Sequence, residues 1–323
     1  MIDQVRILLP EPKCNLKCSY CINKYFDTNN ISFNTSYSDE YDCKEMFKKL
    51  DTYIFNNISF WGGEPLFNEY FPSILKQVAE RYEDVSINVL SNGIFLTKEI
   101  VQLLNKYNVH LSISHDAYNQ HFRCHDFLTD EYIDLLNEVK HFNGFNVVVH
   151  NKNLDLVKIV EWFDSKDIKG DWQVSFELFE LTDDRLLSFV PSAKDYVNFY
   201  NGYKNMLKLA FSGHNRLASE AKRAININRS TPKGFRCGAS SRLCIDTSGH
   251  SWHCQVTYEC KNDITYDNSI PSMCSECKWV SKCKGICPLI PDRYRKKVCM
   301  MYHLYYDVIN EVIPKVDEDI DHD

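Results

Sequence analysis

The sequence has no apolar run near the roughly eighteen residues that a transmembrane helix needs. Its first ten residues, MIDQVRILLP, lack the cationic start, long apolar segment and small-residue cleavage site of a signal peptide. Positive charge is not in excess either. The formal net charge of -7 argues against a dedicated nucleic-acid-binding protein, which would be basic. We therefore expect a cytoplasmic globular protein with neither a membrane nor a nucleic acid as its partner.

Cysteine is abundant, with fourteen in a chain of 323 residues. The cytosol keeps thiols reduced, so disulfides are not expected and metal or cluster ligation becomes the leading interpretation. Three cysteines gather at Cys14, Cys18 and Cys21, and nine lie between Cys237 and Cys299. Hydrophobic residues make up 44% of the chain, which is enough to bury a large core. We expect one large domain and a smaller cysteine-rich domain.

Short apolar runs alternate with amphipathic stretches up to about residue 190, a pattern typical of strand-helix units around a parallel sheet. The predicted strands are Val5–Leu9, Ile58–Trp61, Val85–Leu90, Val109–Ser114, Asn146–Val149 and Trp172–Leu178. The predicted helices between them are Cys43–Asn56, Glu69–Glu83, Thr97–Tyr107, Thr129–Phe142 and Leu154–Asp164. The fold class is therefore α/β, with six strand-helix units in residues 1–190 that suit a partial or a complete barrel. Its functional residues should gather at the C-terminal ends of the strands.

The pattern changes after these units. Residues 191–230 are predicted to form a helical bridge, and residues 231–305 a small cysteine-rich domain held by metal more than by a core. A last helix, Met301–Val312, is predicted to end at Pro314. Residues 306–323 would then comprise the end of that helix and a solvated acidic tail.

The first cysteine cluster, Cys14-x3-Cys18-x2-Cys21, directly follows the first predicted strand. Three thiolates at this spacing can bind three irons of a 4Fe-4S cluster and leave the fourth iron open for a substrate or cofactor. Zinc with a distant fourth ligand and a purely structural loop are the alternatives. An aromatic residue, Tyr20, stands just before the third cysteine.

This motif resembles the signature of the radical S-adenosylmethionine (SAM) superfamily. The resemblance implies that the three cysteines hold a 4Fe-4S cluster and that SAM chelates its open iron. Reductive cleavage of SAM would then give a 5'-deoxyadenosyl radical that abstracts a hydrogen atom from the substrate. The fold that the resemblance implies is the partial radical SAM barrel.

Motifs at the ends of later strands support the resemblance. Gly62-Gly63-Glu64-Pro65 is similar to the superfamily's GGEP motif, and glycines there allow a close backbone approach to a ligand. Arg123 would bind the methionine carboxylate, because a guanidinium can form two parallel hydrogen bonds. Ala117 follows Asp116 where the family often has glycine. The SAM contacts that the resemblance implies are Tyr20, Gly62, Gly63, Glu64, Pro65, Ser91, Asn92, Ser112, Ser114, Asp116 and Arg123.

The second cysteine cluster has more thiols than one four-ligand metal needs, so the sequence predicts two metal centres. Zinc is an alternative on spacing alone, since C-x2-C pairs are common zinc ligands. The array resembles the SPASM domain of a radical SAM subgroup, which carries two auxiliary 4Fe-4S clusters. By that resemblance Cys274, Cys277, Cys283 and Cys299 serve one cluster and Cys237, Cys254 and Cys287 the other. Cys244 and Cys260 compete for the remaining position.

SPASM enzymes mostly act on peptides or proteins, so the resemblance implies a radical SAM oxidoreductase that oxidises or crosslinks a peptide side chain, as in the maturation of ribosomally made peptides. The layout is closest to the anaerobic sulfatase maturases. In those enzymes an aspartate follows the second SPASM cysteine as the proposed base, whereas here Gln255 follows Cys254. An amide cannot accept a proton in that role, so formylglycine formation is not favoured.

Two other hypotheses remain open: a radical SAM dehydrogenase or lyase on a small molecule or nucleotide, and a non-catalytic iron-sulfur scaffold or electron carrier. The expected partners are a peptide or protein substrate and an electron donor such as flavodoxin or ferredoxin. Thirteen residues precede Cys14, too few for a leader-binding domain, so we expect either that the barrel mouth and SPASM face bind the substrate or that a separate protein presents it. No residue is assigned as the catalytic base. The acid/base groups expected near the barrel mouth are His115, Glu177, Glu180 and Tyr258.

Overall fold

The computed structural model describes most of the chain. The described residues are 2–22, 37–38, 40–178, 181, 184–229, 241–252, 254, 272–283, 285, 287 and 290–320.

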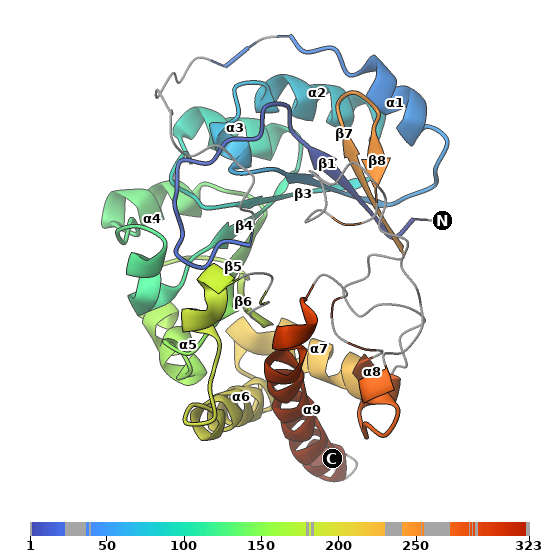
Figure 1. The fold of residues 1–323 in the computed structure, drawn as a ribbon. Helices are drawn as coiled ribbons and strands as arrows, with labels where there is room; N and C mark the ends of the chain where they lie inside the picture. The colour runs from blue at the N-terminus through green and yellow to red at the C-terminus, as the bar shows by residue number, and fades with distance from the viewer. Residues whose placement is uncertain are drawn as a thin grey trace.

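One curved sheet organises the molecule (Figure 1). Its order is β6-β5-β4-β3-β2-β1-β7-β8, and neighbouring strands are parallel except for the antiparallel β7–β8 pair. The strands are β1 Gln4–Leu8, β2 Asn57–Trp61, β3 Ser86–Ser91, β4 His110–Ser114, β5 Phe142–Val149, β6 Gln173–Leu178, β7 Arg242–Asp246 and β8 Ser251–Trp252. The predicted α/β class and the partial barrel of six sequential parallel strands are confirmed.

Helices cover the outer side of the sheet (Figure 1). They are α1 Lys44–Leu50, α2 Phe71–Arg81, α3 Lys98–Lys106, α4 Asp130–Asn137 and α5 Leu156–Asp164. Two start where the sequence predicts: the Thr97 hydroxyl accepts from the Ile100 N–H and the Thr129 hydroxyl from the Tyr132 N–H. The remaining helices are α6 Tyr196–Phe211, α7 Ala218–Arg229, α8 Val280–Cys283 and α9 Asp292–Ile320.

The two faces of the sheet differ in polarity. Val5 and Ile7 of β1 are fully buried towards the helices, and the same alternation recurs in β2 and β4. Their partly exposed neighbours, such as Arg6, Ser59 and Ser112, point to the inner face. The inner face therefore carries these polar side chains beside a small apolar cluster of Leu8, Trp61, Cys244 and Trp252.

Residues 242–252, which the sequence analysis grouped with the cysteine-rich domain, belong to the main sheet. β7 pairs in parallel with β1, with Gln4 opposite Arg242 and Arg6 opposite Cys244. This pairing joins segments more than 230 residues apart, and no local pattern signals it. The helices of 191–230 are also part of the main body, because α7 packs against β6 and α6 packs against α5 and α9.

Several predicted boundaries are wrong. The helix predicted at Cys43–Asn56 ends at Leu50, and the strand predicted from Asn146 already begins at Phe142. The helix predicted to reach Phe142 ends at Asn137, because β5 begins at Phe142 and pairs with β4 from that residue on. The last helix begins at Asp292, not Met301, because buried Tyr294 and Val298 extend its apolar stripe by about two turns. It also continues through Pro314 to Ile320, so the predicted end is overturned. A proline in a helix removes one hydrogen bond but need not stop it.

Candidate functional site

The first cysteine loop lies at the C-terminal end of β1. The Leu16 N–H is 3.5 Å from the Cys14 Sγ, and the Cys21 N–H donates to the Cys18 carbonyl over 3.1 Å. All three thiols are partly exposed. Burial, with the nearby Glu64 charge, raises the pKa of Cys14 to about 12. Three thiols on one loop, with an N–H donor at the first, fit a cluster with an open iron.

The glycine motif packs directly onto this loop. The Glu64 N–H donates to the carbonyl oxygen of Lys13 over 2.8 Å. Gly63 has a φ of +40°, and a Cβ built there would stand 1.9 Å from the same Lys13 oxygen. Only glycine leaves room for the two backbones to meet. The glycine at 63 is therefore required by the approach of the β2 end to the residue preceding Cys14.

The carboxylate of Glu64 is buried and saturated with protein donors. It accepts from the Leu66 N–H over 3.0 Å, from the Ser91 hydroxyl over 2.6 Å and from the Asn92 N–H over 2.6 Å. Burial raises its pKa to about 7, and the donors oppose that shift. Glu64 thus joins the ends of β2 and β3. Its predicted contact with SAM stays a prediction.

Asn92 extends this connection to the cysteine loop. Its side-chain nitrogen donates to the Asn15 side-chain oxygen over 2.8 Å and lies 4.0 Å from the Cys14 Sγ. The residues predicted at the ends of β2 and β3 are therefore gathered against the first cysteine loop.

A second network reaches the loop from the end of β4. The Tyr20 hydroxyl donates to the Asp116 carboxylate and accepts from the Arg123 Nη1 over 3.0 Å. Asp116 is fully buried, and burial raises its pKa. The Arg123 guanidinium also lies over the Tyr20 ring, 5.8 Å from its centroid. The structure thus brings together three residues that the sequence predicts as SAM contacts.

The other residues predicted in the β4 region lie outside the Tyr20, Asp116 and Arg123 network. Ser112 and Ser114 alternate with buried Leu111 and Ile113, so they lie on the inner face of β4. Ala117 adopts a φ of +53°, so the turn after Asp116 forms without glycine. The Ala117 N–H donates to the His115 Nδ1 over 3.0 Å.

The two predicted acid/base groups that the structure describes, His115 and Glu177, do not pair with each other. His115 is fully buried, stacks on Trp162 with ring centroids 5.3 Å apart and lies 3.2 Å from the Asp126 carboxylate. Burial lowers its pKa, so it is a neutral structural residue. Glu177 lies on the inner face of β6, with its carboxylate 3.5 Å from the Arg223 guanidinium. Glu180 and Tyr258 lie outside the described residues.

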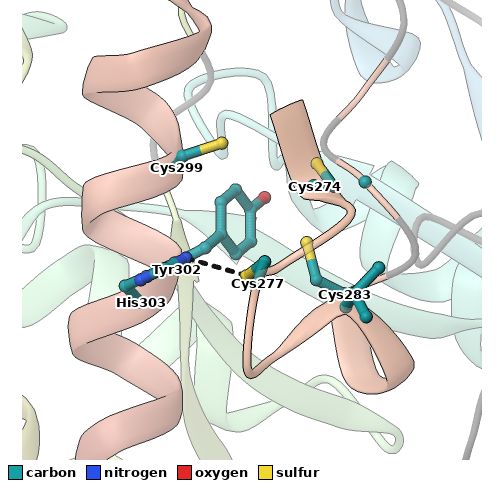
Figure 2. Close-up of a pocket in the computed structure, with 8 residues that line it drawn as sticks. Cys274, Cys277, Cys283, Cys299, Tyr302 and His303 are labelled. Carbon is teal, nitrogen blue, oxygen red and sulfur yellow. Dashed lines mark hydrogen bonds between the residues drawn. The ribbon is translucent and has the colours of Figure 1, made fainter. Parts of the chain in front are cut away.

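Four cysteines of the second cluster line one pocket. Figure 2 shows Cys274, Cys277 and Cys283 on the segment 272–283, which ends in the short helix α8 and faces Cys299 on α9. These are the four that the sequence analysis assigned to a single auxiliary cluster. In the described part of the chain no three such side chains converge on one ion. A 4Fe-4S cluster takes one thiolate per iron, so its ligands surround the site without meeting at a point.

The remaining cysteines are less closely gathered. Cys244 is fully buried on β7, packed with Leu8 and Trp252. Cys254 lies just after β8, and Cys287 lies before α9 with partial burial. The predicted ligands Cys237 and Cys260, and also Gln255, lie outside the described residues. The second auxiliary site therefore stays a prediction.

The sequence analysis missed His303. Its Nε2 is 3.1 Å from the Cys277 Sγ, and it lines the same pocket (Figure 2). The signal was present, because His303 follows Cys299 by four residues and such a pair shares one face of a helix.

Comparison with known proteins decides the nature of the first site. The family description "Radical SAM superfamily" matches residues 9–162. Residues 9–162 form a radical SAM domain. This range holds the cysteine loop, the glycine motif and the network of Tyr20, Asp116 and Arg123. The radical SAM prediction made from the cysteine spacing is confirmed for these residues, and this family implies a 4Fe-4S cluster and SAM.

Relatives of this radical SAM chain carry different activities. It is 21% identical over 335 residues to the radical SAM cyclopropyl synthase TigE of Paramaledivibacter caminithermalis, covering 87% of this chain and 66% of the relative. It is 22% identical over 216 residues to an S-adenosylmethionine-dependent nucleotide dehydratase of Lacinutrix mariniflava, covering 60% of this chain and 45% of the relative. The chain thus spans about half to two thirds of these relatives.

Solved structures show the same fold. The structure of anSMEcpe with bound AdoMet superposes with a TM-score of 0.70 at 19% identity, covering 98% of this chain and 100% of that one. SuiB of Streptococcus suis, bound to the precursor peptide SuiA, gives a TM-score of 0.60 at 15% identity, covering 92% of this chain and 76% of that one. Among the helices that the structure describes, none combines the length and hydropathy that a bilayer span requires.

Proposed function

We propose that this radical SAM chain oxidises or crosslinks a side chain of a peptide or protein substrate. The observation that carries the proposal is a fold likeness over 98% of the chain to anSMEcpe, which has also been solved with a Kp18Cys peptide. SuiB, another structural neighbour, was solved with the precursor peptide SuiA. The likeness therefore extends past the radical SAM domain into the region of the four-cysteine pocket.

Two groups of cysteines would hold two different clusters for this reaction. Cys14, Cys18 and Cys21 would hold the SAM-binding cluster, and bound SAM would supply the radical that removes a hydrogen atom. Cys274, Cys277, Cys283 and Cys299 would hold an auxiliary 4Fe-4S cluster. Oxidation of a C–H bond removes two electrons, one with the abstracted hydrogen atom and one more. A cluster held by these four thiolates would supply an acceptor for that second electron, and the proton lost with it would pass to solvent. A second auxiliary cluster belongs to the proposal, with Cys254 and Cys287 among its ligands.

The inner face of the sheet supplies a surface for the substrate. Gln4, Asn57, Ser59, Ser112 and Ser175 are partly exposed there, and each offers a hydrogen-bonding group. An extended peptide presents a backbone N–H and a C=O at every residue, so such a lining can bind it without a charged contact. The electron donor, a flavodoxin or ferredoxin, and a separate substrate-presenting protein are part of this proposal.

The test is substrate-dependent turnover. Reconstituted, dithionite-reduced protein is incubated with SAM and a pooled peptide set, and peptide masses are compared with those from a Cys14, Cys18 and Cys21 triple alanine variant. The proposal predicts peptides that have lost two hydrogen atoms only with the unsubstituted protein. Stimulation of SAM cleavage by nucleotides and not by any peptide would overturn it.

A nucleotide substrate is the second candidate, favoured by one arrangement on the inner face. Arg6 on β1 and Arg242 on β7 both donate from Nε to the Gln4 side-chain oxygen, over 3.1 and 3.2 Å. Burial and the neighbouring Arg242 lower the pKa of Arg6 to about 10. Two guanidiniums this close favour an anion, such as a phosphate group, between them. This candidate predicts that Arg6→Gln abolishes nucleotide-stimulated 5'-deoxyadenosine formation while Lys208→Gln, on the outer helix α6, leaves it unchanged.

A further inference from the structure

Helix α9 presents three polar side chains on one face. Cys299, His303 and Asp307 are spaced four residues apart, so they lie one above the other along the helix. All three are partly buried. Their neighbours Val298, Met301 and Tyr305 are buried towards the body of the molecule. The polar stripe therefore faces the segment 272–283 and not the apolar core.

Residues of the segment 272–283 contact His303 and Asp307 of this polar stripe. The Cys277 Sγ lies 3.1 Å from the His303 Nε2. One turn further on, the Asp307 carboxylate accepts from the Lys278 Nζ over 2.6 Å and from the Trp279 Nε1 over 3.0 Å. Lys278 and Trp279 directly follow Cys277. Their hydrogen bonds to Asp307 thus fix the position of Cys277 relative to His303.

His303 is a fifth donor at a site that needs four. Four thiols, from Cys274, Cys277, Cys283 and Cys299, line the pocket, and a 4Fe-4S cluster takes one ligand per iron. Figure 2 shows the imidazole directed at the Cys277 sulfur from the side of α9. A thiolate that binds iron carries no proton, so the hydrogen between these two atoms would belong to the imidazole nitrogen.

We propose that His303 donates a hydrogen bond from Nε2 to the Cys277 thiolate and thereby raises the reduction potential of the cluster in this pocket. The inference rests on the proposed auxiliary cluster. Reduction adds negative charge to the cluster and its sulfurs, and an N–H donor stabilises that charge. His303 is a positioning and tuning residue, which leaves all four thiols to bind iron. A cluster with a higher potential is a better acceptor of the second substrate electron.

The test measures iron content and reduction potential, not activity. The Cys14, Cys18 and Cys21 triple alanine variant serves as the background, because it removes the SAM-binding cluster from the spectrum. His303→Ala, His303→Gln and Met300→Ala are added to it separately. The Gln side chain keeps an N–H donor, and Met300 is an exposed residue of the same helix. Each reconstituted protein is titrated with reductant and followed by electron paramagnetic resonance.

We expect the same iron content per chain in every variant. In His303→Ala, the reduction potential of one cluster should shift to a more negative value. His303→Gln should shift less, and Met300→Ala not at all. An unshifted potential in His303→Ala overturns the inference, and so does a loss of about four irons, which would make His303 a ligand or an assembly residue. Zinc in place of iron in the His303 parent would overturn the proposed auxiliary cluster itself. Metal analysis of the parent separates that failure from a failure of the histidine role.

Discussion

The N–H of Glu64 donates a hydrogen bond to the carbonyl oxygen of Lys13 over 2.8 Å, which fixes the end of β2 against the residue before Cys14. The glycine motif thus shapes the cysteine loop as well as the space beside it. A substitution in the glycine motif can therefore change the iron content of the protein, and this is measured separately from SAM binding.

Gly63→Ala should displace the cysteine loop. The added methyl would stand 1.9 Å from the Lys13 oxygen, well inside contact distance, so the Lys13–Cys14 backbone has to shift. We expect a loss of about four irons from a total of about twelve, with 5'-deoxyadenosine formation near background. The control is Gly170→Ala. Gly170 has a φ of +81°, but in the described part of the chain no atom lies within 4 Å of its added Cβ. Equal iron content in the two variants would contradict this prediction.

Glu64→Gln should destabilise the fold. The three donors at the carboxylate, from Leu66, Ser91 and Asn92, would meet an amide that can accept at only one of its two ends. A buried group that loses its partner costs about 1–3 kcal/mol. Urea unfolding of the two proteins measures this difference. Glu83→Gln, at an exposed site, is the control and should change the free energy of unfolding very little. Equal midpoints for Glu64→Gln and the unsubstituted protein would refute the structural role of Glu64.

Arg123→Lys should weaken SAM binding. An ammonium cannot reproduce the guanidinium fork that contacts the Tyr20 hydroxyl and, by our prediction, the SAM carboxylate. Loss of one charge-assisted hydrogen bond is worth about 1.5–3 kcal/mol, so the Kd should rise at least roughly ten-fold. Equilibrium dialysis with reconstituted protein gives the value. Arg81→Lys, on the outer helix α2 beside Asp51, is the matched control. An unchanged Kd in Arg123→Lys would remove this residue from the SAM site.

Glu220 predicts a pH dependence of stability. It is fully buried on α7, with the Phe176 N–H and the Arg223 guanidinium on one oxygen, and in the described structure its Oε2 has no hydrogen-bond partner. Burial raises its pKa from 4.5 to about 7, although Arg223 opposes the shift. A raised carboxyl pKa means that the folded state holds the proton more tightly than the unfolded state, so this contribution is lost as the pH rises from about 4.5 to 7.

The matched variant for that dependence is Glu220→Gln, which stays neutral at every pH. Relative to it, the unsubstituted protein should lose up to about 3 kcal/mol of stability between pH 5 and roughly pH 8. Urea unfolding across this pH series tests the sign. A constant difference between the two proteins would show that Glu220 is ionised throughout.

Local patterns predicted most of the barrel. Apolar alternation placed strands β1 to β4 and β6 within about three residues of their ends, because each strand buries one face against helices. Thr97 and Thr129 marked two helix starts, since a hydroxyl cap is a property of the adjacent turn. The four cysteines that the resemblance assigned to one cluster line one pocket in the structure, and their role as cluster ligands stays a prediction.

The features that the sequence did not reveal depend on contacts between distant segments. The pairing of Arg242 with Gln4 extends the sheet, and the hydrogen bond of Tyr20 with Asp116 links the first loop to the end of β4. The spacing places His303 on the same helix face as Cys299, but its contact with Cys277 depends on how α9 packs against residues 272–283. The length of α9 was misjudged because Pro314 is usually read as a helix end, whereas the packed face before it stabilises the helix.

The central claim is that this chain cleaves SAM to modify a substrate. The most direct measurement is mass-spectrometric detection of 5'-deoxyadenosine from reconstituted, dithionite-reduced protein with SAM and the pooled peptides. The Cys14, Cys18 and Cys21 triple alanine variant runs in parallel. We predict 5'-deoxyadenosine from the unsubstituted protein alone, with a rate that rises when the peptides are present. No 5'-deoxyadenosine from protein loaded with its full iron, with or without peptides, would contradict the account.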